Sequence, residues 1–126
     1  MFSKISALAF FLCLFSFISS KAQTTNLTPQ EFIAKVKTTK NAQLLDVRTP
    51  QEWEAGKIAS SSCINVNDTA FKQQIEKLDK NKPVFVYCAA GGRSSKAAPI
   101  LQQAGFKYIY NLTGGGYKDL ASAGVK

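Results

Sequence analysis

Residues 84–95 read VFVYCAAGGRSS, and this stretch carries most of the information about the fold and the chemistry. Four bulky residues at 84–87 run up to Cys88, small residues follow at 89–92, and Arg93 and two serines come next. A short apolar run bounded by glycine is typical of a buried strand in a parallel sheet. The pattern therefore predicts a strand that ends on one thiol, followed by a tight loop and a helix.

Strand and helix signals alternate along the rest of the chain. TPQE occurs at 28–31 and again at 49–52, and in each copy Thr can cap a helix, Pro suits its first turn and Glu can complete a capping box. Further strands are predicted at residues 43–47, 63–66 and 107–110, and further helices at 68–78, 94–104 and 117–123. The alternation predicts an α/β fold with a central parallel sheet covered by helices on both faces. Ligands of such sheets bind beyond the carboxyl ends of the strands, where we expect Cys88.

The first 22 residues have the pattern of a secretory signal peptide. Lys4 precedes an apolar run at 5–18, and Ser20 and Ala22 occupy the small-residue positions before a cleavage site. The run is shorter than the ~20 residues that a membrane-spanning helix needs. We therefore expect cleavage after Ala22.

Two other interpretations of this segment stay open: an uncleaved N-terminal anchor, and a lipoprotein signal at Cys13. The second is disfavoured because bulky Leu12 precedes that cysteine, where a small residue is expected. With cleavage, the domain is residues 23–126. We expect it to be exported to a bacterial periplasm and to have no stable membrane association.

The charge balance is positive but diffuse. The chain has 16 Lys and Arg against 8 Asp and Glu, and loss of Lys4 and Lys21 would leave 14 against 8, a net charge of +6. No block of like charge and no interleaving of basic and aromatic residues points to a nucleic-acid partner. A positive field would draw small anions toward a pocket, or would serve solubility alone.

The cysteine and histidine counts limit the chemistry further. Cys63 and Cys88 are the only cysteines after residue 22, no CxxC motif occurs, and the chain has no histidine. The absence of histidine excludes Cys-His and Ser-His-Asp catalysis and disfavours a zinc site, so we expect neither a metal nor a cofactor. Cys88 must obtain any activation from another source.

The loop after Cys88 can provide that activation. The pKa of a thiol falls at the N-terminus of a helix, and small residues allow consecutive backbone N–H groups to turn toward an anion. Arg93 adds a fixed positive charge. We therefore expect the loop to hold an anion, either the thiolate, a persulfide or a bound oxyanion. The alternative is that Cys88 is simply a small buried apolar residue.

Three segments carry a recognisable pattern: LLDVRTPQEWEAGKI (44–58), KPVFVYCAAGGRS (82–94) and AGFKYIYNLTGGG (104–116). They resemble segments of single-domain rhodaneses, which are thiosulfate sulfurtransferase-like proteins. Their order and spacing agree with the family from about residue 28 to the C-terminus. The resemblance implies the rhodanese fold and a cysteine that carries sulfane sulfur as a persulfide, from thiosulfate or a similar small anion to a thiol or cyanide.

The resemblance also implies roles for individual residues. Cys88 would be the sulfur carrier, and the loop residues would bind the sulfur or the donor; these are Ala89, Ala90, Gly91, Gly92, Arg93 and Ser94. Arg93 would fix the loop or meet the donor's anionic end. Asp46 and Arg48 match the family's DVR residues and are expected to support the site. Glu52 could pair with Arg93, although a capping role is the preferred interpretation.

The sequence departs from the family pattern at several positions, which include Ser60-Ser61 in place of Gly-Ala and the absence of the usual tryptophan after the paired-glycine turn. Lys57 stands where the family often has His, and Cys63 stands where it often has Asn. We expect Lys57 to face solvent. We expect Cys63 to be free and not bridged to Cys88, because the first is placed at the start of one parallel strand and the second at the end of another.

Other functions compete with sulfur transfer. Phosphatases and arsenate reductases that use a similar cysteine loop have five residues between Cys and Arg, whereas four separate Cys88 from Arg93. The shorter loop fits one sulfur atom better than a tetrahedral phosphate. A non-enzymatic sulfur-relay or protein-binding module, with a protein as sulfur donor or acceptor, stays open. The sequence identifies neither the donor nor the acceptor, nor the oligomeric state.

Overall fold

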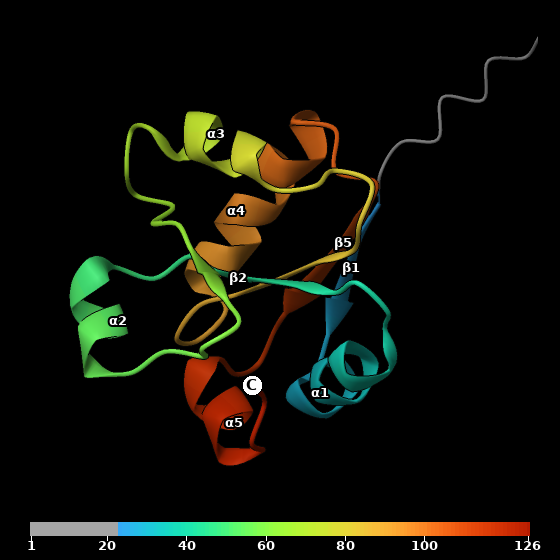
Figure 1. Cartoon of the computed structure of the whole chain (residues 1–126), viewed down its shortest axis with the longest axis vertical. Coiled ribbons are helices and arrows are strands. Elements are labelled where there is room, and N and C mark those ends of the chain that lie inside the picture. The colour runs from blue at the N-terminus through green and yellow to red at the C-terminus, as the bar shows by residue number, and fades with distance from the viewer. Residues whose placement is uncertain (1–22) are drawn as a thin grey trace, which may run out of the picture.

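A computed structural model describes residues 23–126; the expected signal peptide, residues 1–22, lies outside them. Five parallel strands form one sheet in the order β1-β5-β4-β2-β3 (Figure 1). The strands are β1 (Gln23–Leu27), β2 (Gln43–Asp46), β3 (Ser62–Cys63), β4 (Val84–Tyr87) and β5 (Tyr108–Leu112). The helices are α1 (Pro29–Thr38), α2 (Pro50–Ala55), α3 (Phe71–Gln74), the 3₁₀ turn η1 (Ile75–Lys77), α4 (Gly92–Gln103) and α5 (Tyr117–Ser122). None of the helices within residues 23–126 combines the length and apolarity needed to cross a membrane.

Each face of the sheet has its own apolar cluster. Beneath α3 and α4, the core includes Leu45, Val86, Phe71, Leu101 and Phe106, all at most 2% exposed. On the opposite face, beneath α1 and α5, it includes Phe32, Phe85, Leu112 and Leu120. Figure 1 shows the two helical layers on either side of the strands. The predicted α/β fold, a parallel sheet with helices on both faces, is confirmed.

The two TPQE segments start helices as predicted. Thr28 Oγ1 accepts from Glu31 N at 3.3 Å at the start of α1, and Thr49 Oγ1 accepts from Glu52 N at 3.4 Å at the start of α2. Only the second segment forms a complete capping box, because Glu52 Oε1 also accepts from Thr49 N at 3.3 Å. Glu52 is therefore held at a fixed place on α2.

Two predicted elements are much shorter or more divided than expected. The strand predicted at 63–66 is β3, which covers only Ser62–Cys63. The helix predicted at 68–78 is a four-residue α3 followed by η1. Asp68 Oδ1 accepts from Ala70 N at 2.8 Å, a local turn that occupies the backbone where the longer helix would begin.

The first strand, β1, has no counterpart in the sequence prediction. Of its five residues only Leu27 is buried, so the segment has no apolar periodicity. Its pairing with β5 creates the strand, and Thr113 N and Oγ1 both donate to Leu27 O, at 2.9 and 3.1 Å. Asn111 Nδ2 also donates to Asn26 Oδ1 at 3.1 Å. Non-local hydrogen bonds therefore define this edge of the sheet.

Candidate functional site

Cys88 lies just beyond the carboxyl end of β4, which pairs with β2 on one side and β5 on the other. Every residue of β4 is buried, and Cys88 itself is 1% exposed. Its side chain belongs to the apolar cluster beneath α4. The thiol is therefore almost closed off from solvent, and a reactant must bring a small reacting atom to it.

The loop after Cys88 turns backbone donors toward the sulfur. Gly91 has φ 101°, a left-handed conformation that favours glycine, and its N–H donates to Cys88 Sγ at 3.0 Å. The chain enters α4 at Gly92, two residues earlier than predicted. The side chain of Ser94, in the first turn of this helix, is fully buried, and its Oγ lies 3.6 Å from the sulfur.

These contacts lower the pKa of the Cys88 thiol. Burial alone would raise the pKa, but hydrogen bonds from the backbone and side chain of Ser94 and from the backbones of Ala90 and Gly91 outweigh it. The Ser94 hydroxyl has a single proton, which in the thiol form can go to Gly91 O at 3.2 Å or Leu112 O at 3.4 Å. Once the thiol has ionised, the same hydroxyl can turn and donate to the sulfur.

The predicted loop residues therefore separate into two groups. Ala90, Gly91 and Ser94 supply hydrogen bonds to the sulfur. Gly92 begins α4, and its position has open space where a Cβ would lie. Ala89 is exposed at the rim of the loop.

Arg93 points to α2 and pairs with Glu52. The ion pair is bidentate, with Nη1 2.5 Å from Oε1 and Nη2 2.9 Å from Oε2. The hydrogen bonds from Arg93 lower the pKa of Glu52 to about 2, with further help from Thr49. Glu52 thus serves both as a capping residue and as the partner of Arg93, so the preference for capping alone was too narrow. The pair ties the start of α4 to α2.

Asp46 and Arg48 form a second, buried pair beside the site. Arg48 Nη2 lies 2.8 Å from Asp46 Oδ2 and also donates to Gly56 O at 2.8 Å, and its Nε bonds the same carboxylate at 3.0 Å. The guanidinium carbon lies 4.0 Å from the centroid of the Tyr117 ring, at the distance of a cation–π contact. These contacts connect β2, α2 and α5 and leave both residues in supporting positions.

The paired-glycine turn before α5 packs directly on the cysteine loop, a contact that the sequence analysis missed. Tyr117 N donates to Cys88 O at 2.9 Å. A Cβ at Gly116 would overlap the backbone oxygens of Cys88 and Ala89, so only glycine allows this approach. The signal was present in GGG at 114–116, but the sequence does not say against which backbone the glycine packs.

Cys63 is not bridged to Cys88 and forms no disulfide within the described residues, as predicted, but the reason given for this was wrong. Cys63 pairs with Asp46 and Asp46 pairs with Tyr87, so Cys63 and Cys88 lie near the same edge of the sheet and not at opposite ends. Two strand spacings of about 4.8 Å separate Cys63 from Tyr87, which exceeds the ~7 Å limit for the Cα atoms of a disulfide.

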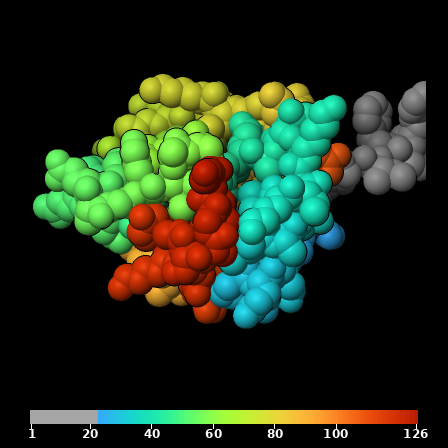
Figure 2. Space-filling model, turned by 60° about the horizontal axis from the view of Figure 1, so that its bottom comes forward, coloured from blue at the N-terminus to red at the C-terminus, as the bar shows by residue number. Residues whose placement is uncertain are grey.

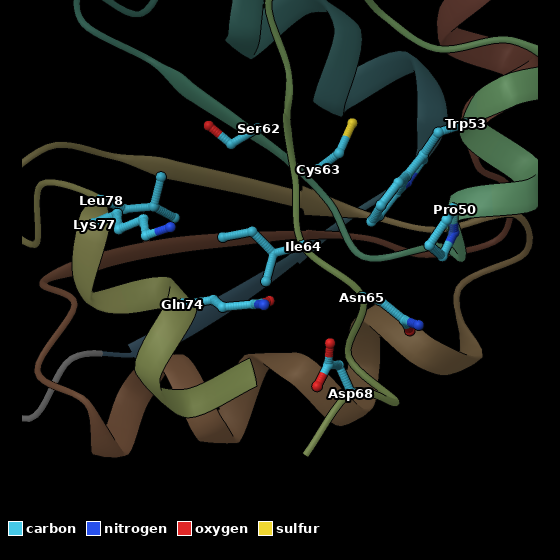
Figure 3. A pocket seen from close by; sticks show the side chains of 10 residues that line it. All are labelled: Pro50, Trp53, Ser62, Cys63, Ile64, Asn65, Asp68, Gln74, Lys77 and Leu78. Atoms are coloured by element: carbon cyan, nitrogen blue, oxygen red, sulfur yellow. The ribbon is translucent and has the colours of Figure 1, made fainter. Parts of the chain in front are cut away.

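Cys63 has its own pocket, separate from the loop of Cys88. Figure 3 shows its sulfur beside Trp53, with Asp68 and Leu78 further along the same pocket of about 430 Å³. Burial raises the pKa of the Cys63 thiol. Lys57, another departure from the family pattern, is exposed to solvent, as predicted.

The sequence matches the Rhodanese-like domain family over residues 28–121. The chain belongs to the rhodanese-like family. It is 37% identical over 100 residues to "Uncharacterized protein YqhL" of Bacillus subtilis, covering 79% of this chain and 75% of that protein. It is 33% identical over 93 residues to "Thiosulfate sulfurtransferase GlpE" of Coxiella burnetii, covering 74% and 81%. It spans only 33% of the length of "tRNA uridine(34) hydroxylase" of Pelagibacter ubique, at 34% identity.

Solved structures show the same rhodanese-like fold. A rhodanese-like domain protein from Staphylococcus aureus superimposes with a TM-score of 0.63 at 28% identity, covering 72% of this chain and 86% of that one. A Rhodopseudomonas palustris protein of unknown function, titled a possible tyrosine phosphatase, has a TM-score of 0.63 at 28% identity, covering 82% and 83%. The fold is therefore shared by proteins with different suggested chemistries, and the loop must distinguish between them.

The hydrogen bonds to Cys88 predict its titration. Alkylation by iodoacetamide should rise with pH through an inflection below that of an ordinary thiol, because the thiolate is the reacting form. Ser94→Ala removes the hydroxyl donor but keeps the amide, so the inflection should move upward. The measurement is the alkylation rate across the neutral range in a Cys63→Ser background. Glu52 stays ionised throughout that range, since its pKa is about 2, and adds no inflection. An inflection for native Cys88 at or above that of Ser94→Ala would contradict the interpretation.

The Arg93–Glu52 pair predicts coupled effects on stability and on the sulfur loading of Cys88 that the family resemblance leads us to expect. Arg93→Ala should leave the protein folded and slow loading from thiosulfate roughly tenfold, since the partly exposed bidentate pair is expected to contribute about 1–2 kcal/mol to loop position. Glu52→Gln should have a similar effect, and the double variant should lose less than the sum. Urea unfolding and single-turnover loading are measured for the native protein, the two single variants and the double variant, which together form a double-mutant cycle. Strictly additive losses would show that the two residues act independently.

Proposed function

We propose that this rhodanese-like protein is a sulfurtransferase that carries sulfane sulfur on Cys88. In the first step the Cys88 thiolate attacks the outer sulfur of thiosulfate, the S–S bond of the donor breaks, and sulfite leaves with the electron pair. Cys88 is then a persulfide anion. In the second step cyanide or a thiolate takes the terminal sulfur, which gives thiocyanate or an organic persulfide and restores the Cys88 thiolate.

The observation that carries this proposal is the set of donors around a buried sulfur. Gly91 N–H lies 3.0 Å from Cys88 Sγ, and Ala90 and Ser94 add hydrogen bonds that favour its anionic form. Such a site suits a thiolate as nucleophile and a persulfide anion as intermediate, and requires no imidazole. The similarity to the Coxiella burnetii protein named thiosulfate sulfurtransferase supports the same reaction class.

The short loop argues for sulfur and against phosphate. Four residues separate Cys88 from Arg93, and Arg93 is occupied by a bidentate bond to Glu52 instead of facing the loop interior. A phosphatase would need its arginine available to the phosphate oxygens. Hydrolysis of p-nitrophenyl phosphate that depended on Cys88 would favour the phosphatase instead.

A protein partner could replace either small reactant. A relay module would accept sulfur from a protein persulfide and show little thiosulfate:cyanide activity. Side-by-side assays with thiosulfate and with a persulfidated carrier protein distinguish the two, because both report on the same Cys88 adduct.

We further propose that the protein acts outside the cytoplasm of a bacterium. The support is the pattern of residues 1–22, with Lys4, the apolar run at 5–18 and the small residues Ser20 and Ala22. In an oxidising compartment a low-pKa thiol is exposed to sulfenic acid formation and mixed disulfides. The 1% exposure of Cys88 would limit such reactions to small reagents.

Replacement of Cys88 tests the sulfur carrier directly. Thiosulfate treatment of the native protein should add the mass of one sulfur atom, and Cys88→Ser should show no gain, because a hydroxyl does not ionise appreciably near neutral pH. Cys63→Ser is the matched control and should load like the native protein. Intact-mass spectrometry makes the measurement. A Cys88→Ser protein that still gained sulfur would show that another group is the acceptor.

The export proposal predicts a mature protein that begins at Gln23. Cell fractionation followed by N-terminal sequencing should recover that form from the periplasmic fraction. Recovery of the uncleaved chain from the cytosol would refute export and leave the sulfur chemistry of Cys88 untouched.

A further inference from the structure

A cleft of about 430 Å³ lies between α2 and α5, beside the cysteine loop. Its walls are formed by Arg48, Glu52, Ala55, Gly56, Ala89, Tyr117 and Lys118. Ala89 directly follows Cys88 and is exposed, so the cleft comes within one residue of the sulfur carrier. Figure 2 shows this side of the molecule, with the C-terminal residues of α5 (red) beside the α2 region (green).

All but one of the charged side chains that line this cleft form hydrogen bonds or ion pairs with other residues of the protein. Arg48 is bonded to Asp46 and to Gly56 O, and Glu52 is bonded to Arg93. Lys118 is exposed and forms no ion pair with any residue of the described chain, 23–126. Lys118 is therefore the cation of the cleft that a ligand's anionic group can meet without breaking an existing pair.

Apart from its charged groups, the lining of the cleft is largely apolar. Ala55 and Ala89 contribute methyl groups, and the Tyr117 ring forms the wall between α5 and Arg48. The ring is held in place, because the backbone N–H of Tyr117 donates to Cys88 O and the Arg48 guanidinium lies 4.0 Å from the ring centroid. A ligand that fits this strip has a short carbon chain with an anion at one end.

We propose that the cleft binds an organic thiol bearing a carboxylate, and that this thiol is the sulfur acceptor. This inference rests on the proposed sulfurtransferase function. The carboxylate pairs with Lys118, the carbon chain lies on Ala55, Ala89 and the Tyr117 ring, and the thiolate reaches the Cys88 persulfide. The thiolate attacks the terminal sulfur, the Cys88 S–S bond breaks, the electron pair returns to Cys88 as its thiolate, and the organic persulfide leaves. Cyanide presents neither a chain nor a carboxylate to these groups.

A charge series of small thiols tests the assignment. Cys88 is loaded with thiosulfate, and sulfur transfer is measured with mercaptopropionate, mercaptoethanol and cysteamine, which carry a negative, neutral and positive group. Comparing each variant with the native protein for the same thiol cancels the intrinsic reactivity of that thiol. Relative to mercaptoethanol, mercaptopropionate transfer should fall about threefold in Lys118→Ala and about tenfold in Lys118→Glu, as for an exposed ion pair removed or reversed. Cysteamine transfer should rise in Lys118→Glu, and Lys118→Arg should restore the native preference.

Lys107→Glu is the matched control for net charge. Lys107 is exposed and directly precedes β5. It therefore lies at the amino-terminal end of the parallel strands, whereas the cysteine loop lies at their carboxyl-terminal end. Lys107→Glu should leave the ratio of the transfer rates to mercaptopropionate and mercaptoethanol unchanged. A shift in this ratio like that of Lys118→Glu would show a general field effect and overturn the assignment.

The outcomes distinguish this inference from the proposed sulfurtransferase function on which it rests. If Cys88 loads normally and the ratio of mercaptopropionate to mercaptoethanol transfer does not change in Lys118→Glu, the acceptor assignment is wrong and the sulfurtransferase proposal stands. If thiosulfate loading slows in Lys118→Glu as much as mercaptopropionate transfer does, Lys118 serves the donor anion and the assignment is also wrong. If Cys88 accepts sulfur from neither thiosulfate nor the persulfides of these thiols, both proposals fall.

Discussion

The arrangement around Cys88 depends on how a buried sulfur anion is stabilised. Removing a charge from water is costly unless hydrogen bonds replace the lost solvent. Here the replacement comes from Gly91 N–H at 3.0 Å, from Ala90, and from the amide and hydroxyl of Ser94. Because the backbone donors are fixed by the loop and the first turn of α4, only the Ser94 hydroxyl has to turn when the thiol ionises.

A loop that supplies donors in this way must be held from outside, and three contacts do so. Arg93 ties the start of α4 to α2 through Glu52. Tyr117 N bonds Cys88 O, and Gly116 allows the two backbones to approach closely. Arginine, which would contact an oxyanion in a phosphate-binding loop, has a structural role here. The positive character at the sulfur comes instead from backbone dipoles.

The two thiols show how local surroundings set different chemistry within one sheet. Cys63 and Cys88 lie near the same edge, yet hydrogen bonds lower the pKa of Cys88 and burial raises that of Cys63. Neighbouring α2 and α5 also shape the approach to Cys88, since their side chains form a cleft with an apolar wall and with Lys118, which has no ion-pair partner among residues 23–126. The loop therefore determines the reacting atom, and the helices beside it are suited to select what that atom meets.

The local sequence by itself predicts a central strand, two helix starts and the loop after Cys88. The run at 84–87 predicts a central strand, since apolar residues on both faces require cover on both sides. The two TPQE segments predict helix starts, because capping depends on residues three apart. The loop of small residues between Cys88 and Arg93 predicts an anion-holding turn, because its spacing and backbone freedom are local properties. The family resemblance adds the sulfur-carrier role that we propose for Cys88.

Only the tertiary structure decided the rest, because those features depend on contacts between distant segments. Strand β1 has one buried residue and exists through pairing with β5. The positions of Cys63 and Cys88 depend on register: the pairing of β3 with β2 brings Cys63 to the same edge as Cys88. The partner of Arg93 lies 41 residues away, and Tyr117 lies 29 residues after the carbonyl that it bonds. Side-chain identity gives each of these residues the capacity to bond, but which groups meet is set by packing the helices against the sheet.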